Sequence, residues 1–515
     1  MAKYIRIKSI LTATLISLVS GVMMALSLPP FSMWYLGIFG VGLFGFNLLY
    51  VSCEKTFNTT KARKYRFLAG VCAGLSQYVI SLWWVNGFAV LGTVVLVIIY
   101  SLFFGLLALL CTTYNPISFI IAYSSAFTLG DFIKSNFPFG GLPIGSLDLP
   151  QVLGPLKYGA KIGGGSLIEF MLFLIGGSIS VIAFGLITRD VKSHIYAATF
   201  GVLVVIALTV FGEFSPASGI SVGQRNIALV QGGGQRGLRA VTGGNAQVVY
   251  QNALNATQLI PATFKPDLIL WPEDVVALNS PLQGSPQQST LRAIASSYHS
   301  CFIAGVTSPV GNTSFLNLAV AFDPNGLELG TYLKVHRVPF GEYMPYRSFF
   351  AHFGNVSLVP RDAIAGKKPG YFKTPCGNFG VMISYEVFYG SSARASVNSG
   401  ANLLVVPTNT ASYSSDQVPG EEVMADSMRA IETGRDLIQA SPTGYSTIVL
   451  RSGKVTSKSG LGNEQLILGK VNLYSGLTLY DKFGSTPVII VILLTYLGSL
   501  LFAILRKKSK ATHSQ

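Results

Sequence analysis

Residues 380–390 read GVMISYEVFYG, a short apolar run that ends in a Ser-Tyr-Glu turn. The run over 381–383 has the length and composition of a strand that is buried on both faces. Such strands belong to sheets covered by helices, so the stretch predicts an α/β domain around it. Ser384 follows the strand directly, at the strand end where α/β proteins place their sites. No histidine lies nearby in sequence to activate its hydroxyl.

Similar apolar runs recur on both sides of this stretch, and each is bounded by Pro, Gly or Asn. A helical pattern lies between two of them, at residues 420–437. The alternation of strands and helices favours an α/β fold. The other runs are NIALVQ (226–231), DLILWPE (267–273), CFIAGV (301–306), NLAVAF (317–322), ANLLVVPTN (401–409) and TIVL (447–450).

The composition of the whole chain points to a membrane protein. Half of the 515 residues are hydrophobic and only 11% are charged, whereas an ordinary soluble domain has about 25% charged residues. Eight segments have the length and apolarity of spanning helices. The third is the weakest, because WWVNG at its end is typical of the membrane interface. The eight are 9–28, 34–52, 67–84, 88–111, 117–133, 163–187, 195–212 and 486–505.

The net charge of +15 is compatible with a nucleic-acid partner or an anionic membrane. With eight spans, the basic residues of the short loops all fall on one side, which the positive-inside rule assigns to the cytoplasm. Much of the positive charge therefore reflects membrane topology, and no nucleic-acid partner is expected. We expect a transmembrane domain at 1–213, an extracytoplasmic domain at 214–485, and a last span with a basic tail at 486–515. The basic residues are Lys3, Arg6, Lys8, Lys55, Lys61, Arg63, Lys64, Arg66, Arg189, Lys192, Arg506, Lys507, Lys508 and Lys510.

Polar residues at the ends of the apolar runs form a candidate site. Glu273 ends one run, and Ser384 and Glu386 follow another. Lys334 and then Glu342 occur in the segment GTYLKVHRVPFGEYMP. A glutamate, a lysine and a small nucleophile that converge would supply a base, a cation for an oxyanion and an attacking group. The alternative interpretation is that Glu273 and Lys334 form a surface ion pair.

Other motifs do not point to a site. The five cysteines and five histidines show neither CxxC pairs nor metal-ligand spacing, so the sequence indicates neither a zinc site nor a disulfide framework. GGGQRG at 232–237 matches a dinucleotide-binding loop, but the next acidic residue is Asp267, so we interpret it as a surface loop. Asp131, near a span end and close to Lys134, is the feature that would suit a transporter.

Three motifs resemble the Glu-Lys-Cys signatures of the nitrilase superfamily: WPE at 271–273, KVHRVPFGEYMP at 334–345 and MISYE at 382–386. With the flanking spans, the chain resembles the apolipoprotein N-acyltransferase family of bacterial envelopes. SNFPFGGLP at 135–143, PTNTASYSSDQ at 407–417 and MRAIETGRDLIQASPTGYS at 428–446 also resemble motifs of that family.

The resemblance implies an αββα sandwich, in which helices cover two central sheets, on the outer face of the inner membrane. It implies transfer of a fatty acyl chain from a phospholipid to the S-diacylglyceryl-cysteine of a lipoprotein, by a monomer without metal or cofactor. Glu273 would be the general base, Lys334 the oxyanion stabiliser and position 384 the nucleophile. Glu342 and Glu386 would be supporting acids, with Glu386 orienting Lys334, and Tyr385 matches the residue after the nucleophile.

The chain departs from the family at the nucleophile, where it has Ser384 in place of cysteine. A serine hydroxyl is a much weaker acid than a thiol, so a glutamate base is poorly matched to it. The serine is an engineered substitution, a slow natural nucleophile or the mark of an inactive lipid-binding relative. Cys376 lies before the strand that leads to Ser384, so it is not expected to replace Ser384 as the nucleophile.

Two further expectations concern substrate access. The apolar, aromatic segment 348–360, with Phe349, Phe350 and Phe353, suits an interfacial lid, although an ordinary packed loop has the same composition. A membrane-tethered amidase that acts on small amides would use the same three reactive positions, but it would have no need of seven preceding spans.

Overall fold

The computed structural model of the chain separates into a helical unit and an α/β unit. The helical unit comprises Met1–Phe137, Gly141–Ser215 and Ser485–Gln515, and the α/β unit comprises Pro138–Gly140 and Pro216–Gly484. The structure describes residues 5–53, 59–113, 115–215, 219–234, 246–352, 359–413 and 415–512.

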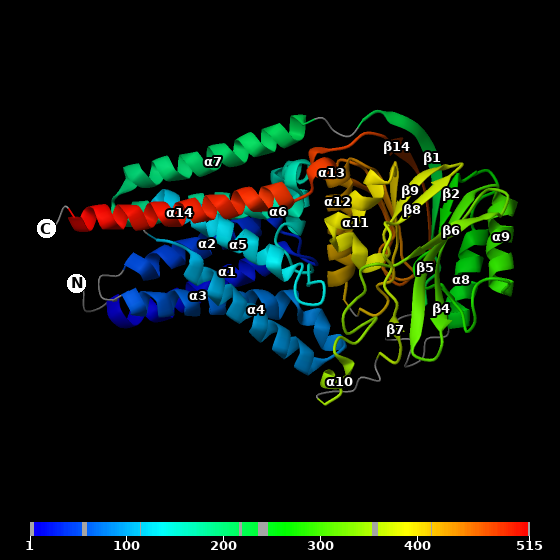
Figure 1. Cartoon of the computed structure of the whole chain (residues 1–515), viewed down its shortest axis with the longest axis horizontal. Coiled ribbons are helices and arrows are strands. Elements are labelled where there is room, and N and C mark those ends of the chain that lie inside the picture. Colours follow the sequence, from blue (N-terminus) through cyan, green and yellow to red (C-terminus); the bar gives the residue numbers. More distant parts are fainter. Residues whose placement is uncertain are drawn as a thin grey trace. The chain divides into compact units, whose positions relative to one another are not determined.

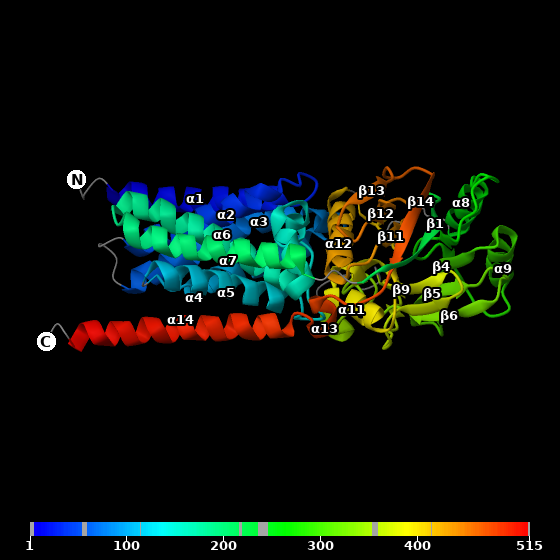
Figure 2. The same ribbon diagram turned by 90° about the horizontal axis from the view of Figure 1, so that it is seen from above.

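Long helices that run side by side make up the helical unit (Figures 1 and 2). Each of the eight predicted spans coincides with or overlaps one of them. Six helices in the described residues are long and apolar enough to cross a membrane. Two of the eight helices are not among these six. Helix α3 has basic residues in its first turns, and the described apolar part of α14, Thr486–Phe502, is shorter. The helices are α1 (Ile5–Ser27), α2 (Trp34–Cys53), α3 (Thr59–Ser81), α4 (Val90–Leu110), α5 (Pro116–Lys134), α6 (Ala160–Thr188), α7 (Val191–Phe214) and α14 (Thr486–Thr512).

Small residues allow α3 and α4 to approach closely. A Cβ atom added to Gly70 would lie 2.7 Å from the Cα atom of Gly105, and one added to Gly74 would lie 2.9 Å from the Cα atom of Ser101. Close backbone approach through small residues is the usual way in which membrane helices gain contact area, because lipid supplies no hydrophobic driving force between them.

The acid that would suit a transporter is neutralised locally. The Lys134 ammonium lies 2.9 Å from a carboxylate oxygen of Asp131, one turn earlier on α5. Ser146 accepts a hydrogen bond from Lys134 and donates one to Asp131, at 2.9 and 3.0 Å. Asp131 is therefore accounted for as the ion-pair partner of Lys134, and no transported solute is needed to explain it.

Two sheets form the centre of the α/β unit. The first has eight strands, ordered β14-β1-β2-β4-β5-β6, with β3 beside β4 and β7 beside β5; the second has six, ordered β13-β12-β11-β10-β9-β8. The strands are β1 (Ser221–Gln231), β2 (Leu268–Leu270), β3 (Val276–Ala277), β4 (Cys301–Val310), β5 (Ser314–Phe322), β6 (Glu328–Leu333), β7 (Asp362–Ala363), β8 (Tyr371–Thr374), β9 (Gly377–Val381), β10 (Leu403–Pro407), β11 (Leu437–Ala440), β12 (Thr447–Val449), β13 (Val455–Lys458) and β14 (Gln465–Tyr474).

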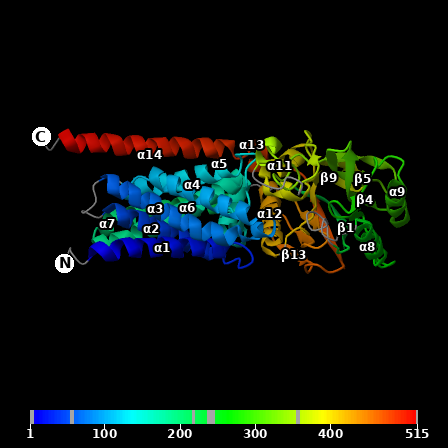
Figure 3. The ribbon, with the colours of Figure 1, turned by 90° about the horizontal axis from the view of Figure 1, so that it is seen from below.

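Helices cover the outer face of each sheet. Helices α8 (Ala246–Gln258) and α9 (Pro286–Tyr298) lie on one side of the strands, and α11 (Gly390–Asn398) and α12 (Gln417–Thr433) lie on the other (Figures 1 and 3). One apolar core lies between the sheets and joins residues such as Leu270 and Val381. A second core joins the eight-stranded sheet to α8 and α9. The predicted αββα sandwich is confirmed.

Most of the predicted apolar runs form strands, but the helix expected over 420–437 begins and ends earlier in the structure, starting at Gln417. Helix α12 ends at Thr433, because Gly434 adopts a left-handed conformation (φ 59°) that glycine tolerates better than other residues. Strand β11 then begins at Leu437. The glycine motif at 232–237 lies partly outside the described residues.

The expectation of no disulfide is wrong. Cys301 and Cys376 form a disulfide bond, although 75 residues separate them in sequence. Cys301 begins β4 of the eight-stranded sheet, and Cys376 lies in the turn before β9 of the six-stranded sheet. Stacking of the two sheets brings the cysteines together. Because they are far apart in sequence, a search for short cysteine spacings could not predict the bond.

Replacement of Gly70 by leucine should destabilise the helical unit, because the new side chain has no space against Gly105. We expect the melting temperature in lipid nanodiscs to fall by several degrees. Gly498→Leu on α14 is the matched control, since a Cβ atom there meets nothing within 4 Å. Equal melting temperatures for the two variants would contradict the close α3–α4 packing.

Candidate active site

Glu273 is delivered by the short parallel strand β2. The strand ends at Leu270, and the chain continues through Trp271, which is fully buried and donates a hydrogen bond to Thr257 (2.9 Å). The backbone N–H of Glu273 donates to the carbonyl of Thr408, which follows β10 of the other sheet, at 3.3 Å. Glu273 therefore lies where the carboxyl ends of strands from both sheets meet.

Lys334 follows β6 and is the cation of the site. Its backbone N–H donates to the carbonyl of Asn317 at 3.0 Å. Its ammonium lies 2.9 Å from the Glu273 carboxylate and 2.8 Å from the Glu342 carboxylate. Lys334 is 1% exposed and Glu273 is 5% exposed. The two residues do form an ion pair, as the alternative interpretation held, but the pair is buried and has a third member.

Asn317 on β5 joins the two carboxylates and was not predicted from the sequence. Its side-chain amide donates to Glu273 at 2.7 Å and to Glu342 at 3.0 Å. The second carboxylate oxygen of Glu342 accepts from the backbone N–H of Val338 at 2.8 Å. An asparagine at the start of the apolar run NLAVAF was the available signal, because a buried amide needs partners.

Burial and charge set the protonation of this cluster. Burial raises the pKa of Glu273, the Lys334 ammonium opposes that rise, and Glu342 adds to it. Burial lowers the pKa of Lys334, but Glu273 and Glu342 outweigh burial, and the pKa lies above its ordinary value. A carboxylate whose proton affinity is raised beside a permanent cation suits the transfer of a proton to and from a substrate.

Ser384 follows β9 at the start of a 3₁₀ turn, Ser384–Phe388. Its φ angle of 50° is left-handed, a conformation that costs a non-glycine residue about 1–3 kcal/mol and that often marks a functional position. The preceding strand is parallel to β10, with Val381 opposite Val405. Ser384 and the Thr408 segment that contacts Glu273 therefore follow neighbouring parallel strands.

Glu386 connects the serine turn to the lysine segment, although not as the resemblance implied. Its carboxylate accepts from the backbone N–H groups of Val335 and His336, at 2.7 and 3.0 Å, and from Ile383 at 2.7 Å. The Tyr332 hydroxyl also donates to it, at 2.9 Å. Glu386 therefore fixes the backbone after Lys334 and the backbone before Ser384, while Glu342 contacts the ammonium itself.

An aromatic group lies beside the serine turn. The rings of His336 and Tyr389 stack at 4.1 Å, and Tyr385 packs edge-on against Tyr389 at 5.3 Å. The Tyr389 hydroxyl donates to the carbonyl of Gly140 at 3.0 Å. The segment Pro138–Gly140, from the motif SNFPFGGLP, thus belongs to the surroundings of the site.

A further acid near the site was also missed. Glu422 on α12 is buried and accepts a hydrogen bond from the Thr408 hydroxyl at 2.5 Å. Burial raises its pKa to about 8, and the nearby Glu273 adds to that rise. Thr408 therefore contacts both glutamates: its carbonyl accepts from the backbone N–H of Glu273, and its hydroxyl donates to the carboxylate of Glu422.

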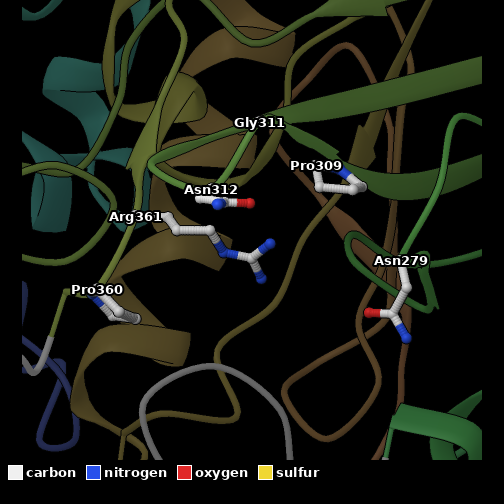
Figure 4. Close-up of a pocket in the computed structure, with 6 residues that line it drawn as sticks. All are labelled: Asn279, Pro309, Gly311, Asn312, Pro360 and Arg361. Carbon is white, nitrogen blue, oxygen red and sulfur yellow. The ribbon is translucent and has the colours of Figure 1, made fainter.

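A pocket of about 480 Å³ lies elsewhere in the α/β unit. The Arg361 guanidinium points into it, with Asn312 and Asn279 around it (Figure 4). The residues that line it do not include Glu273, Lys334 or Ser384, so this pocket is separate from the catalytic candidates. Its lining is Asn279, Pro309, Gly311, Asn312, Pro360 and Arg361.

Comparison with known proteins matches both parts of the chain. Residues 20–178 match the apolipoprotein N-acyltransferase N-terminal domain, and residues 226–476 match the carbon-nitrogen hydrolase family. An apolipoprotein N-acyltransferase of Geobacter metallireducens is 25% identical, over 91% of each chain. One of Mycolicibacterium smegmatis is 26% identical, over 94% of this chain and 84% of the relative.

A solved structure of a nitrilase-superfamily protein from Saccharomyces cerevisiae is 20% identical and covers 50% of this chain and 93% of its own, with a TM-score of 0.38. The domain matches and the full-length relatives agree on one assignment. The chain belongs to the apolipoprotein N-acyltransferase family, with a nitrilase-like α/β domain that follows its N-terminal apolar helices.

Proposed function

We propose that the chain transfers a fatty acyl group from a phospholipid to the α-amino group of the S-diacylglyceryl-cysteine at the N-terminus of a lipoprotein. The observation that carries the proposal is the buried lysine between two carboxylates, Lys334 with Glu273 and Glu342, in a chain that also has membrane helices. The family relatives, which are named for this acceptor, support the same reaction.

The first half-reaction would form an acyl-enzyme at position 384. Glu273 takes the Ser384 hydroxyl proton while the oxygen attacks the ester carbonyl of the phospholipid. The carbonyl oxygen gains negative charge, and the Lys334 ammonium stabilises it. The carbon–oxygen bond to the glycerol then breaks, and Glu273 returns the proton to the lysophospholipid that leaves.

In the second half-reaction, the acceptor amine attacks the acyl-enzyme ester and Glu273 receives the amine proton. The nitrogen forms the amide bond, and the proton passes to the departing Ser384 oxygen. An oxygen ester is a poorer acyl donor to an amine than a thioester, and the serine proton is harder to remove. Both steps are therefore slower with Ser384 than with a cysteine.

An exposed aromatic surface in the α/β unit supports a lipid donor. Phe139 packs against Phe340 and Tyr346, and Phe340 packs against Phe350. Phe349 also contacts Phe350 and is 57% exposed, so it does not point into the core. Phe139, Phe340 and Tyr346 all have left-handed φ angles, which indicates that tertiary contacts hold this surface in place. Phe353 of the predicted lid lies outside the described residues.

We place the α/β unit on the outer face of the bacterial inner membrane, since the basic loops of the sequence favour a cytoplasmic N-terminus. The phospholipid and the lipidated acceptor would then both reach the site from the outer leaflet. The reaction needs neither a metal nor a dissociable cofactor, and a single copy of the chain holds all the proposed reactive groups.

Ser384→Cys should increase acyl transfer, because Glu273 then deprotonates a thiol. We expect the variant in lipid nanodiscs to release lysophospholipid from a labelled phospholipid and to carry an acyl adduct at position 384, detectable by peptide mass spectrometry. The chain as it stands should release at least ten-fold less. In the Ser384→Cys background, Glu273→Gln should abolish the adduct.

Two outcomes would count against this mechanism. Equal turnover with serine and cysteine would refute the argument that a glutamate base needs a thiol. A cysteine form that acylates nothing would leave a lipid-binding relative, and release of ammonia from small amides without lipid would indicate a tethered amidase.

Glu386→Gln should impair the adduct step by misplacing the reactive groups. Its amide keeps only one acceptor oxygen, so it can accept either from Val335 and His336 or from Ile383, and its NH2 group faces the N–H of the other segment. The lysine segment and the serine turn would then separate. We expect adduct formation in the Ser384→Cys background to slow by about 100-fold, the loss typical of a displacement near 1 Å. The exposed Glu464→Gln serves as control, and equal rates in both variants would rule out the proposed role of Glu386.

Phe349→Ser should weaken lipid access with little effect on the chemical step. Burial of one phenylalanine side chain against a bound lipid is worth about 10-fold or more in apparent affinity. We therefore expect the phospholipid KM to rise while kcat in the Ser384→Cys background stays within two-fold. Phe483→Ser is a matched control, because Phe483 is similarly exposed, at 61%. Equal phospholipid KM values for Phe349→Ser and Phe483→Ser would show that the aromatic surface does not bind lipid.

A further inference from the structure

The disulfide bond between Cys301 and Cys376 connects the two sheets of the sandwich. Its sulfur atoms are 2.09 Å apart, and the two Cα atoms are 6.2 Å apart. Both residues are buried and belong to the apolar core between the sheets. The bond is therefore inside the α/β unit, where it constrains how one sheet lies on the other.

The bond lies where the strands that deliver the reactive groups begin. Cys301 is opposite Leu268, the first residue of β2, in a parallel register, and β2 leads to Glu273. Cys376 directly precedes β9, which leads to Ser384. The disulfide thus joins β4, the strand that pairs with β2, to the turn that begins β9.

Polar contacts hold the turn that contains Cys376. The Thr374 hydroxyl accepts from the backbone N–H of Cys376 at 3.1 Å and donates to the carbonyl of Gly377 at 2.7 Å. The Arg225 guanidinium on β1 donates to the Cys376 carbonyl. The turn is therefore held against the eight-stranded sheet by a side chain as well as by the sulfur–sulfur bond.

We propose that oxidation of Cys301 and Cys376 is a maturation step of this chain, and that the bond positions β9 and the Ser384 turn against β2 and Glu273. A thiol oxidase with a disulfide of its own would supply the step. Its disulfide accepts two electrons and two protons from the two thiols, which leaves one bond in this chain and a dithiol in the oxidase. Cys301 and Cys376 act as positioning residues and contact no substrate.

The compartment follows from the same bond. Stable disulfides form in oxidising compartments and are rare in the cytoplasm. The α/β unit has a disulfide, whereas Cys72 and Cys111 of the helical unit are free thiols, with Cys111 buried. This difference suits an α/β domain that folds on the outer side of the membrane, and it does not depend on the loop charges.

The test compares hydrogen exchange in the intact protein with that in a Cys301→Ser/Cys376→Ser variant, both in lipid nanodiscs. Peptide mapping without reductant should first show the 301–376 cross-link in the intact protein. We expect the variant to melt about 5–10 °C lower, as for the loss of a bond that closes a long loop. Exchange should rise at least ten-fold in residues 377–386 and 268–273, and should stay within two-fold in residues 447–458 of β12 and β13.

Cys72→Ser is the matched control, because it removes a free thiol and should change neither the melting temperature nor the hydrogen exchange. If the double variant does not fold, the same exchange measurement on folded protein before and after treatment with a phosphine reductant replaces it. Recovery of Cys301 and Cys376 as alkylated free thiols from the native membrane would overturn the maturation step. Unchanged exchange, or an equal rise throughout the α/β unit, would overturn the positioning role. No readout here depends on acyl transfer.

Discussion

The ammonium of Lys334, buried between the carboxylates of Glu273 and Glu342, is the interaction on which the rest of the site depends. An isolated charge in such a place would be costly, and loss of one partner from a buried pair typically costs about 3–5 kcal/mol. Asn317 donates to both carboxylates, so the cluster holds its two acids close without leaving them to repel each other across an apolar gap. The chain must therefore bring β2, β5 and the end of β6 together before the proposed chemistry is possible.

The sandwich supplies the second constraint, because the proposed nucleophile and the lysine belong to different sheets. Ser384 follows β9 of the six-stranded sheet, whereas Lys334 follows β6 of the eight-stranded one. Glu386 spans the two, since one carboxylate accepts backbone N–H groups from both segments. At the other end of the strands, the disulfide bond joins the same two sheets. The two sheets are thus connected by a covalent bond at one end of these strands and by a buried carboxylate at the other.

Much of this arrangement could be predicted from the sequence, for identifiable reasons. Continuous apolar runs such as LIL before Glu273 mark buried strands, and polar residues that follow such strands are candidates for a site. Glu273, Lys334 and Ser384 could therefore be selected from the sequence, and the family resemblance supplied their proposed roles. Contacts that depend on stacking of the sheets were not: the disulfide, the two bonds of Asn317 and the clamp formed by Glu386 join residues far apart in sequence. Glu422 was hidden for a similar reason, because a glutamate on an amphipathic helix normally faces water, and only the packing of α12 buries it.

The central claim is that position 384 and the Lys334 cluster form one site. Iodoacetamide alkylation of the Ser384→Cys thiol as a function of pH, followed by peptide mass spectrometry, tests this most directly. The charge of Lys334 stabilises a nearby thiolate, so its removal in Lys334→Met should move the alkylation midpoint upward by about one pH unit or more, provided that circular dichroism shows the variant to be folded. A midpoint that is unchanged in a folded Lys334→Met variant would show that the thiol does not sense the lysine, and would contradict the account.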